Sequence, residues 1–111
     1  MNKTSSLHCA DGGMYLHQYL LLQNDNLKTI DTSDSLEEKS WKFINDKLLK
    51  KHPSLLILID TDYDNDCDLS FLQYIQDVEN LSLICRAEVK NIKYISSLQN
   101  LKKLAINILS L

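Results

Sequence analysis

Several residue types on which common activities depend are scarce in this chain of 111 residues. It contains 2 glycines, the adjacent Gly12 and Gly13, and a single arginine, Arg86. Phosphate-binding loops of the P-loop and GxGxxG kinds need glycines at several separate positions, so the sequence excludes both. One arginine and a formal net charge of -3 also leave few of the guanidinium contacts that read bases and phosphates. We therefore expect no nucleic-acid partner.

Long apolar runs are missing as well. No segment reaches the roughly 20 apolar residues that span a bilayer, and residues 1–13 are too polar for the apolar region of a signal peptide. The three cysteines, Cys9, Cys67 and Cys85, are odd in number and show no CxxC or other zinc-ligand spacing. We expect reduced thiols in a cytoplasmic protein that does not contact membranes.

Motifs that carry catalysis are also absent. The sequence has no GxSxG motif and shows no recognisable nucleophile–base pairing. We expect no catalytic residues, no bound metal and no cofactor, and hence a protein that is not an enzyme.

An aliphatic pattern that occurs twice fills the last third of the chain. Its first copy consists of Leu69, Leu72, Ile75, Val78, Leu81 and Leu83. The same pattern returns 23 residues later as Ile92, Ile95, Leu98, Leu101, Leu104 and Ile106. Self-similarity at this period predicts a solenoid, in which each unit buries its apolar edge against the next.

The spacing within each copy predicts its local structure. Residues spaced by three share one edge of a helix or of a series of short turns, and the final pair, spaced by two, suits a strand. Residues Leu55 to Ile59 form a continuous aliphatic run of the length of a buried strand. We therefore expect parallel strands near Leu56–Ile59, Leu81–Cys85 and Leu104–Ile108.

At these positions the sequence resembles the leucine-rich repeat family. The family's LxxLxL core is matched by Val78-x-x-Leu81-x-Leu83 and by Leu101-x-x-Leu104-x-Ile106, and the resemblance covers about residues 53–111. It implies a horseshoe-like solenoid that binds other proteins on its concave, strand-lined face, and it does not imply catalysis.

The chain departs from the family pattern at one position. The Asn or Cys that follows LxL by three residues is replaced by Thr61, Arg86 and Leu109. The departure indicates irregular or capping repeats.

Residues 1–52 carry no family pattern, and their periodicity predicts a cap on the first repeat. A strand is expected at Met14–Leu22, a short second strand at Leu27–Ile30 and a helix over about 35–51, opened by a capping box at Asp34 or Ser35. The predicted fold is thus α/β: a strand-plus-helix cap (1–52) followed by a short leucine-rich-repeat solenoid with parallel strands (53–111), together one structural domain.

Residues that alternate with the buried ones in the predicted strands face outward, on the concave surface of the solenoid. They are Ser82, Ile84 and Arg86 in one copy and Lys103, Ala105 and Asn107 in the next. We interpret them as a binding surface of mixed polarity in which Arg86 and Ile84 serve as anchors. The alternative interpretation is an ordinary solvated surface.

Aspartates alternate through the loop that follows the first predicted strand, at Asp60, Asp62, Asp64, Asp66 and Asp68. If the loop is extended, all five carboxylates project to one side. Three interpretations are open: a solvated acidic loop, a patch that attracts a basic partner, and a Ca²⁺ or Mg²⁺ site. The EF-hand pattern fails, because Asn65 replaces its glycine and Phe71 its bidentate glutamate.

These features predict a non-catalytic module that binds a protein partner through the concave strand face and the acidic loop. One alternative is a small acidic inhibitor, such as an immunity protein that neutralises a basic toxin. Another is a divalent-metal-binding module built on the loop from Asp60 to Asp68. The apolar C-terminal end, with Ile106 and Ile108, also predicts self-association through an open strand edge.

Overall fold

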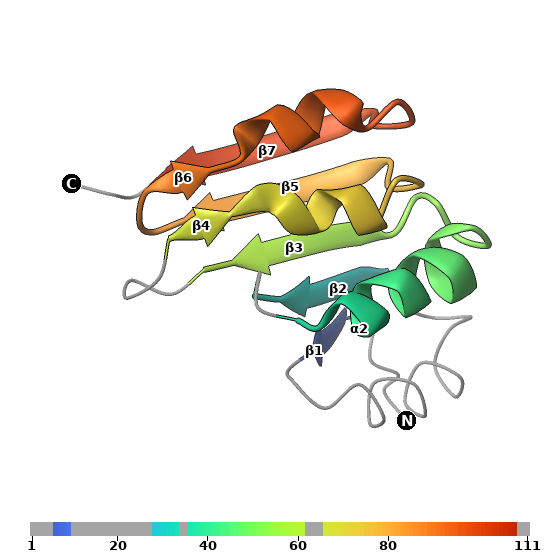
Figure 1. Cartoon of the computed structure of the whole chain (residues 1–111). Helices are drawn as coiled ribbons and strands as arrows, with labels where there is room; N and C mark the ends of the chain where they lie inside the picture. The colour runs from blue at the N-terminus through green and yellow to red at the C-terminus, as the bar shows by residue number, and fades with distance from the viewer. Residues whose placement is uncertain (1–5, 10–27, 34–35, 62–65, 109–111) are drawn as a thin grey trace.

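The computed structural model describes residues 6–9, 28–33, 36–61 and 66–108 of the chain. These residues form a mixed α/β fold in which a parallel sheet is accompanied by short helical segments (Figure 1). Among them, no helix has the length and apolar character needed to cross a membrane.

The main sheet of the described residues contains five parallel strands. They are β1 (Ser6–Cys9), β2 (Thr29–Thr32), β3 (Leu56–Asp60), β5 (Asn80–Cys85) and β7 (Lys103–Ile108). Their order in the sheet, β1-β2-β3-β5-β7, is their order in the sequence. The three parallel strands expected in residues 53–111 are thereby confirmed. The second strand of the predicted cap lies at β2, and it joins the same sheet.

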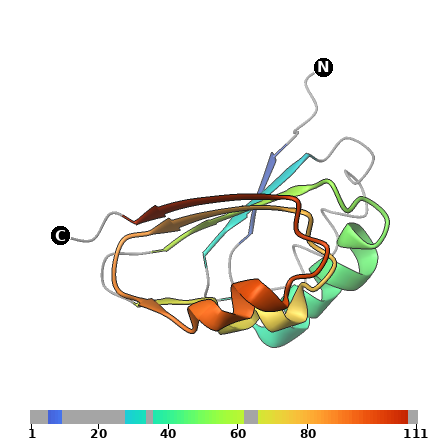
Figure 2. The same cartoon turned by 90° about the horizontal axis from the view of Figure 1, so that it is seen from above.

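The helical segments lie on one side of this sheet (Figure 2). They are α2 (Glu38–Phe43), its π-helical continuation η1 (Ile44–Leu49) and the 3-10 helices η2 (Leu69–Tyr74) and η3 (Ile92–Ser97). A second parallel sheet has two strands, β4 (Cys67–Asp68) and β6 (Val89–Lys90). In the sequence β4 lies just before η2, and β6 just before η3.

The cap helix is shorter than predicted. The expected helix over 35–51 corresponds to α2 and η1 together, and it begins at Glu38. The predicted capping residues Asp34 and Ser35 lie outside the described residues, as does the expected strand Met14–Leu22. The Glu38 carboxylate pairs with Lys42 at 2.6 Å and accepts a hydrogen bond from the Tyr74 hydroxyl at 2.9 Å, so it links α2 to η2.

The core lies between the sheet and the helical segments. On the strands its members are Ile30, Ile57, Ile59, Leu81, Leu83 and Cys85, each at most 1% exposed. Leu69, Leu72, Ile75 and Val78 are buried with them, as the three-residue spacing predicts. At the cap, Trp41 stacks on Phe71 with ring centroids 4.4 Å apart. These aliphatic and aromatic contacts supply the hydrophobic stabilisation of the fold.

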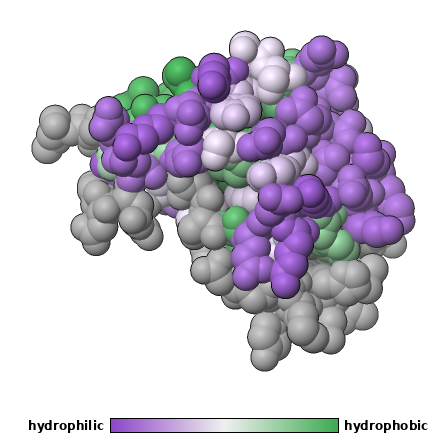
Figure 3. Space-filling view, viewed as in Figure 1, coloured by the Kyte–Doolittle hydropathy of each residue, from purple (hydrophilic) through white to green (hydrophobic). Residues whose placement is uncertain are grey.

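The second copy of the aliphatic pattern is aligned with the first copy on β5 and β7, but several of its side chains are exposed. Leu104 is aligned with Leu81, and Ile106 with Leu83, yet both are among the exposed large apolar residues, together with Ile92 and Ile108. Ile108 is 55% exposed, against 0% for Cys85, its partner in β5. In Figure 3 hydrophobic atoms accordingly gather along the edge of the molecule where β7 ends the sheet.

A polar contact joins η1 to the turn before β5. The Asn45 amide donates to Asp77 Oδ2 at 2.9 Å, and Asn45 Oδ1 accepts from the Asp77 backbone N–H at 3.0 Å. Lys50 Nζ contacts the same carboxylate oxygen at 2.8 Å. These partners, Lys50 first and Asn45 second, lower the pKa of Asp77. Because Asn45 is buried, the contact fixes η1 to the turn that leads into β5.

Asp68 joins η2 to the residue that opens η3. Its Oδ1 accepts a hydrogen bond from the Ser70 backbone N–H at 3.0 Å, as an N-cap residue does, and another from the Asn91 amide at 2.8 Å. These two bonds, that from Asn91 first, lower the pKa of Asp68. Asn91 has a positive φ of 61°, a conformation that asparagine adopts more readily than most residues.

We predict that Asn45→Ala lowers the free energy of unfolding by about 2 kcal/mol, because it removes both hydrogen bonds to Asp77 and leaves a backbone N–H without its acceptor. Urea denaturation at neutral pH measures the change. Asn100→Ala, in the exposed turn before β7, is the matched control and should change stability by less than about 0.5 kcal/mol. Equal effects of the two substitutions would contradict the role assigned to Asn45.

A second prediction concerns pH. Because the folded state lowers the pKa of Asp68, the resulting stability is present above the ordinary value of 3.8 and is lost as the pH falls through the lower, folded pKa. Asn91→Gly keeps the positive φ and removes the amide donor. In this variant the Asp68 pKa should rise toward 3.8 and the loss of stability in acid should become shallower.

Carboxyl-carbon NMR titration measures this shift residue by residue. Asp77 is the internal control, since Asn45 and Lys50 are unchanged. An Asp68 titration that is the same in both proteins would show that Asn91 does not set its pKa.

Candidate functional site

The sheet face opposite the helical segments carries four of the residues expected to bind a partner. Strand β5 alternates half-buried and fully buried residues, and Ser82 and Ile84 are in the half-buried set that faces away from the core. Parallel register aligns Ser82 with Ala105 and Ile84 with Asn107 on β7. The fold therefore brings these four predicted residues together in two adjacent rows.

Strand β3 adds apolar side chains that the sequence analysis did not include. Leu56 and Leu58 alternate with the buried Ile57 and Ile59, so they lie on the outward face. Leu58 is aligned with Ser82 in the neighbouring strand. The continuous aliphatic run from Leu55 to Ile59 predicts a buried strand, and its composition does not indicate which of its residues face outward. Together with Ile84 these leucines form an aliphatic centre on the face that the described helical segments do not cover, the uncovered face.

Arg86 does not present an unpaired cation to this face. Its Nε donates to Asp60 Oδ1 at 2.8 Å and its Nη2 to Asp60 Oδ2 at 3.3 Å, a bidentate geometry. Arg86 follows the last residue of β5, and 26% of its side chain is exposed. The role of Arg86 as an anchor stays a prediction, and within the chain its ion pair borders the aliphatic centre and fixes Asp60 beside Ile84.

Thr61 holds the ends of β3 and β5 together beneath this ion pair. Its backbone N–H and its hydroxyl both donate to the Ile84 carbonyl, at 3.0 and 3.2 Å. The hydroxyl also accepts from the Arg86 N–H at 3.2 Å, and the residue is 1% exposed. Thr61 is one of the positions where the chain departs from the leucine-rich repeat pattern, and here a hydroxyl makes the backbone contacts within the turn.

The aspartates of the acidic loop do not act as one cluster in the described part of the chain. Asp60 pairs with Arg86, Asp66 with Lys90 at 2.7 Å, and Asp68 caps η2. Asp62 and Asp64 lie outside the described residues. Within the residues that the structure describes, no group of three or more His, Cys, Asp or Glu side chains is placed to hold a metal ion. The described carboxylates thus serve local contacts at the carboxyl ends of the strands.

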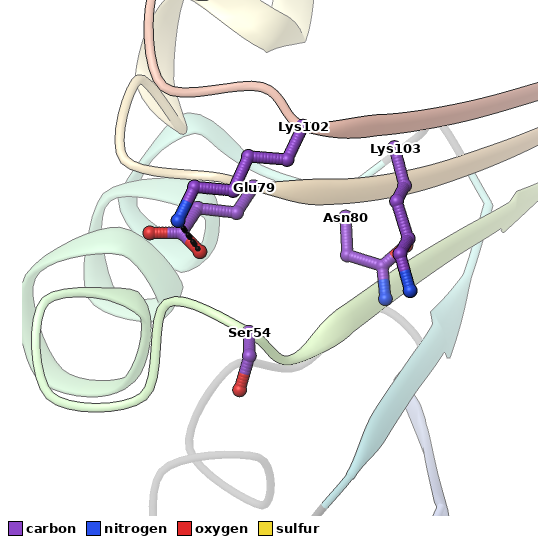
Figure 4. A pocket seen from close by; sticks show the side chains of 5 residues that line it. All are labelled: Ser54, Glu79, Asn80, Lys102 and Lys103. Carbon is purple, nitrogen blue, oxygen red and sulfur yellow. Dashed lines mark ion pairs between the residues drawn. The ribbon is translucent and has the colours of Figure 1, made fainter.

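A basic groove lies at the opposite, amino-terminal ends of the strands (Figure 4). One part, with a volume of about 190 Å³, is lined by Ser54, Glu79, Asn80, Lys102 and Lys103. An adjoining part of about 410 Å³ shares Ser54 and Asn80 and adds Lys28, His52 and Leu55. The figure shows the side chains of Asn80 and Lys103 side by side, both directed toward the segment that carries Ser54.

Lys103 lines the groove from the first residue of β7, where it is aligned with Asn80. Alternation along β7 puts it on the same face as Ala105 and Asn107, the face on which it is predicted to lie. Among the described lining residues only Glu79 carries a carboxylate, which is 3.3 Å from Lys102 Nζ. The groove suits an anionic side chain of a partner. The sequence signal that could have indicated it is a lysine just before β2, Lys28, and two at the start of β7, Lys102 and Lys103.

Charged residues lie at both ends of the uncovered face. Lys28, Lys102 and Lys103 lie where β2 and β7 begin, whereas Asp60, at the end of β3, is paired with Arg86. Side-chain ion pairs fix part of each boundary, and the aliphatic centre lies between them.

No protein-family description, curated protein or solved structure matches the chain.

Proposed function

We propose that the chain is a non-catalytic protein-binding module that contacts its partner through the uncovered sheet face and the acidic loop. The observation that carries this proposal is the one-sided cover of a parallel sheet. Parallel sheets are normally covered on both faces. Here the described helical segments cover one face, and the other presents Leu56, Leu58 and Ile84 in half-buried positions.

The composition of this face supports the proposal. Protein interfaces combine an apolar centre with a polar rim that stays accessible to water. The aliphatic centre is bordered by the Asp60–Arg86 pair at one end and by the basic groove at the other. Because the strands are fixed by backbone pairing, little conformational entropy is lost when a partner contacts them.

The repeated geometry supports a second part of the proposal, that the architecture is a short leucine-rich-repeat solenoid. Successive strands are aligned with Ile57 beside Leu81 and Leu81 beside Leu104. A helical segment and a short strand recur between them, as β4 with η2 and β6 with η3. In such an arrangement each unit contacts only its neighbours, and the uncovered strand face is the usual place for a partner.

The edge strand β7 supports self-association of two copies. Among the described strands it pairs only with β5, so its other side offers unpaired backbone groups. Antiparallel pairing centred on Ile106 would place Leu104 opposite Ile108 of the second copy. It would also put the two Lys103 side chains at opposite ends of the interface. This two-fold arrangement buries the exposed aliphatic residues without facing like charges.

For the sheet face, we predict that Ser82→Arg abolishes partner capture, because a long charged side chain would cover the aliphatic centre next to Leu58. The measurement is quantitative affinity capture from lysate of the source cell, with wild-type and variant baits compared protein by protein. A specific partner should fall by at least about tenfold, which corresponds to about 1.4 kcal/mol of binding free energy.

Gln73→Arg adds the same charge on η2, in the helical layer, and serves as the control that should capture the partner normally. One stoichiometric basic enzyme, inhibited when bound, would favour the inhibitor alternative within the same binding class. Capture profiles that are identical for wild type and Ser82→Arg would reject the sheet face as the binding surface.

For the edge strand, we predict that wild-type protein forms dimers as its concentration rises and that Ile106→Lys raises the dimer dissociation constant by about tenfold or more. The lysine would place a charge at the centre of the proposed interface. Ala105→Lys, on the opposite face of the same strand, should dimerise like wild type. Sedimentation velocity measures association, and circular dichroism checks that each variant is folded. A monomeric wild-type protein at high concentration would exclude the pairing.

A further inference from the structure

Two cysteines that are distant in the sequence meet in the core. Cys67 opens β4 and Cys85 closes β5, and their sulfur atoms are 2.7 Å apart. Both residues are 0% exposed. The contact joins the small two-stranded sheet to the main sheet.

Backbone pairing fixes both cysteines, so their contact is a consequence of the fold. The Cys67 N–H donates to the Glu88 carbonyl at 2.8 Å, and Cys67 is aligned with Val89 in β6. Cys85 is aligned with Ile108 in β7. Neither backbone has to move far to keep the two sulfur atoms together, which is the geometric requirement for a disulfide bond.

The third cysteine lies too far away to compete within one chain. Cys9 is in β1 and is aligned with Thr32, which is aligned with Ile59, which in turn is aligned with Leu83 in β5. Three strand spacings of about 4.8 Å place its backbone roughly 14 Å from β5. Cysteines whose Cα atoms are more than about 7 Å apart cannot be joined without backbone movement.

We propose that Cys67 and Cys85 form a dithiol–disulfide modification site, which closes within one chain when the protein meets a hydroperoxide or a small disulfide. With hydrogen peroxide, one thiolate attacks the peroxide and becomes a sulfenic acid, with release of water. The second thiol then displaces a second water to form the S–S bond, so two electrons pass to the peroxide. With oxidised glutathione, exchange through a mixed disulfide releases two molecules of reduced glutathione.

Formation of this bond would act on the acidic loop. Cys67 lies between Asp66 and Asp68, and Asp66 pairs with Lys90 in β6. The bond would attach the end of the loop covalently to β5, the strand that carries Ser82 and Ile84. The modified protein would therefore resist local opening at the carboxyl ends of the strands. Because both sulfur atoms are buried, the reagent reaches them when this end opens or while the chain folds.

The test uses the full chain with Cys9→Ser, which removes the third thiol. The protein is unfolded, refolded in a mixture of reduced and oxidised glutathione, quenched with an alkylating reagent and weighed intact. The expected product is a monomer about 2 Da lighter, without alkylation, in which peptide mapping joins residues 67 and 85. Its melting temperature should exceed that of the reduced form by roughly 10 °C.

Two comparisons make the outcome decisive. Cys9→Ser with Cys85→Ser should give no intramolecular bond, and a mixed disulfide with glutathione as its only adduct. Treatment of the folded two-cysteine protein with hydrogen peroxide should give the same joined peptide more slowly than refolding. Two alkylated thiols after refolding in oxidised glutathione, or a bond that lowers the melting temperature, would overturn the proposal.

Discussion

Parallel pairing between consecutive strands is the constraint on which the rest of the structure depends. A parallel neighbour must be entered from the same end, so the chain has to return along the sheet after each strand. Because the strands also follow one another in order, the sheet grows in one direction, and right-handed crossovers place the returns that carry described helical segments on the same face. The described helical segments occupy that face (Figure 2). None of the described helical segments lies on the opposite face, and this follows from the topology.

The length of each return determines what lies over the core. The return from β2 to β3 contains α2 and η1, and Trp41 fills the space beneath them. The later returns contain six-residue 3-10 helices, η2 and η3, and Phe71 of η2 is buried against Trp41. Leu81, on β5 between β3 and β7, is 1% exposed, whereas Leu104, on the last described strand, is 42% exposed.

The aliphatic pattern could be predicted from the sequence, because spacing by two identifies the residues of a strand that share one face. Such a face is shared by Leu81 and Leu83 on β5, and the aligned face of β7 carries Leu104 and Ile106. The polar contacts could not be predicted in this way. Asp60 meets Arg86 across 26 positions of sequence, and Asn45 meets Asp77 across 32.

Such contacts depend on strand register and on the path of each return, neither of which local pattern determines. The outward position of Leu58 was missed for a related reason, since a continuous aliphatic run does not show which of its residues are covered. The resemblance to leucine-rich repeats stays a prediction, because the parallel sheet is a feature that other architectures share.

The polar contacts also explain why the uncovered face can be apolar at its centre and still belong to a defined structure. Thr61, buried beneath the Asp60–Arg86 pair, satisfies the backbone groups at the ends of β3 and β5. The face therefore ends in a fixed ion pair rather than in a row of unpaired backbone groups, and the sheet cannot readily extend or slip there. At β7 no comparable contact protects the edge among the described residues, and Leu104, Ile106 and Ile108 are exposed there. The carboxyl ends of β3 and β5 are thus closed by their own side chains, whereas the described edge of β7 is not.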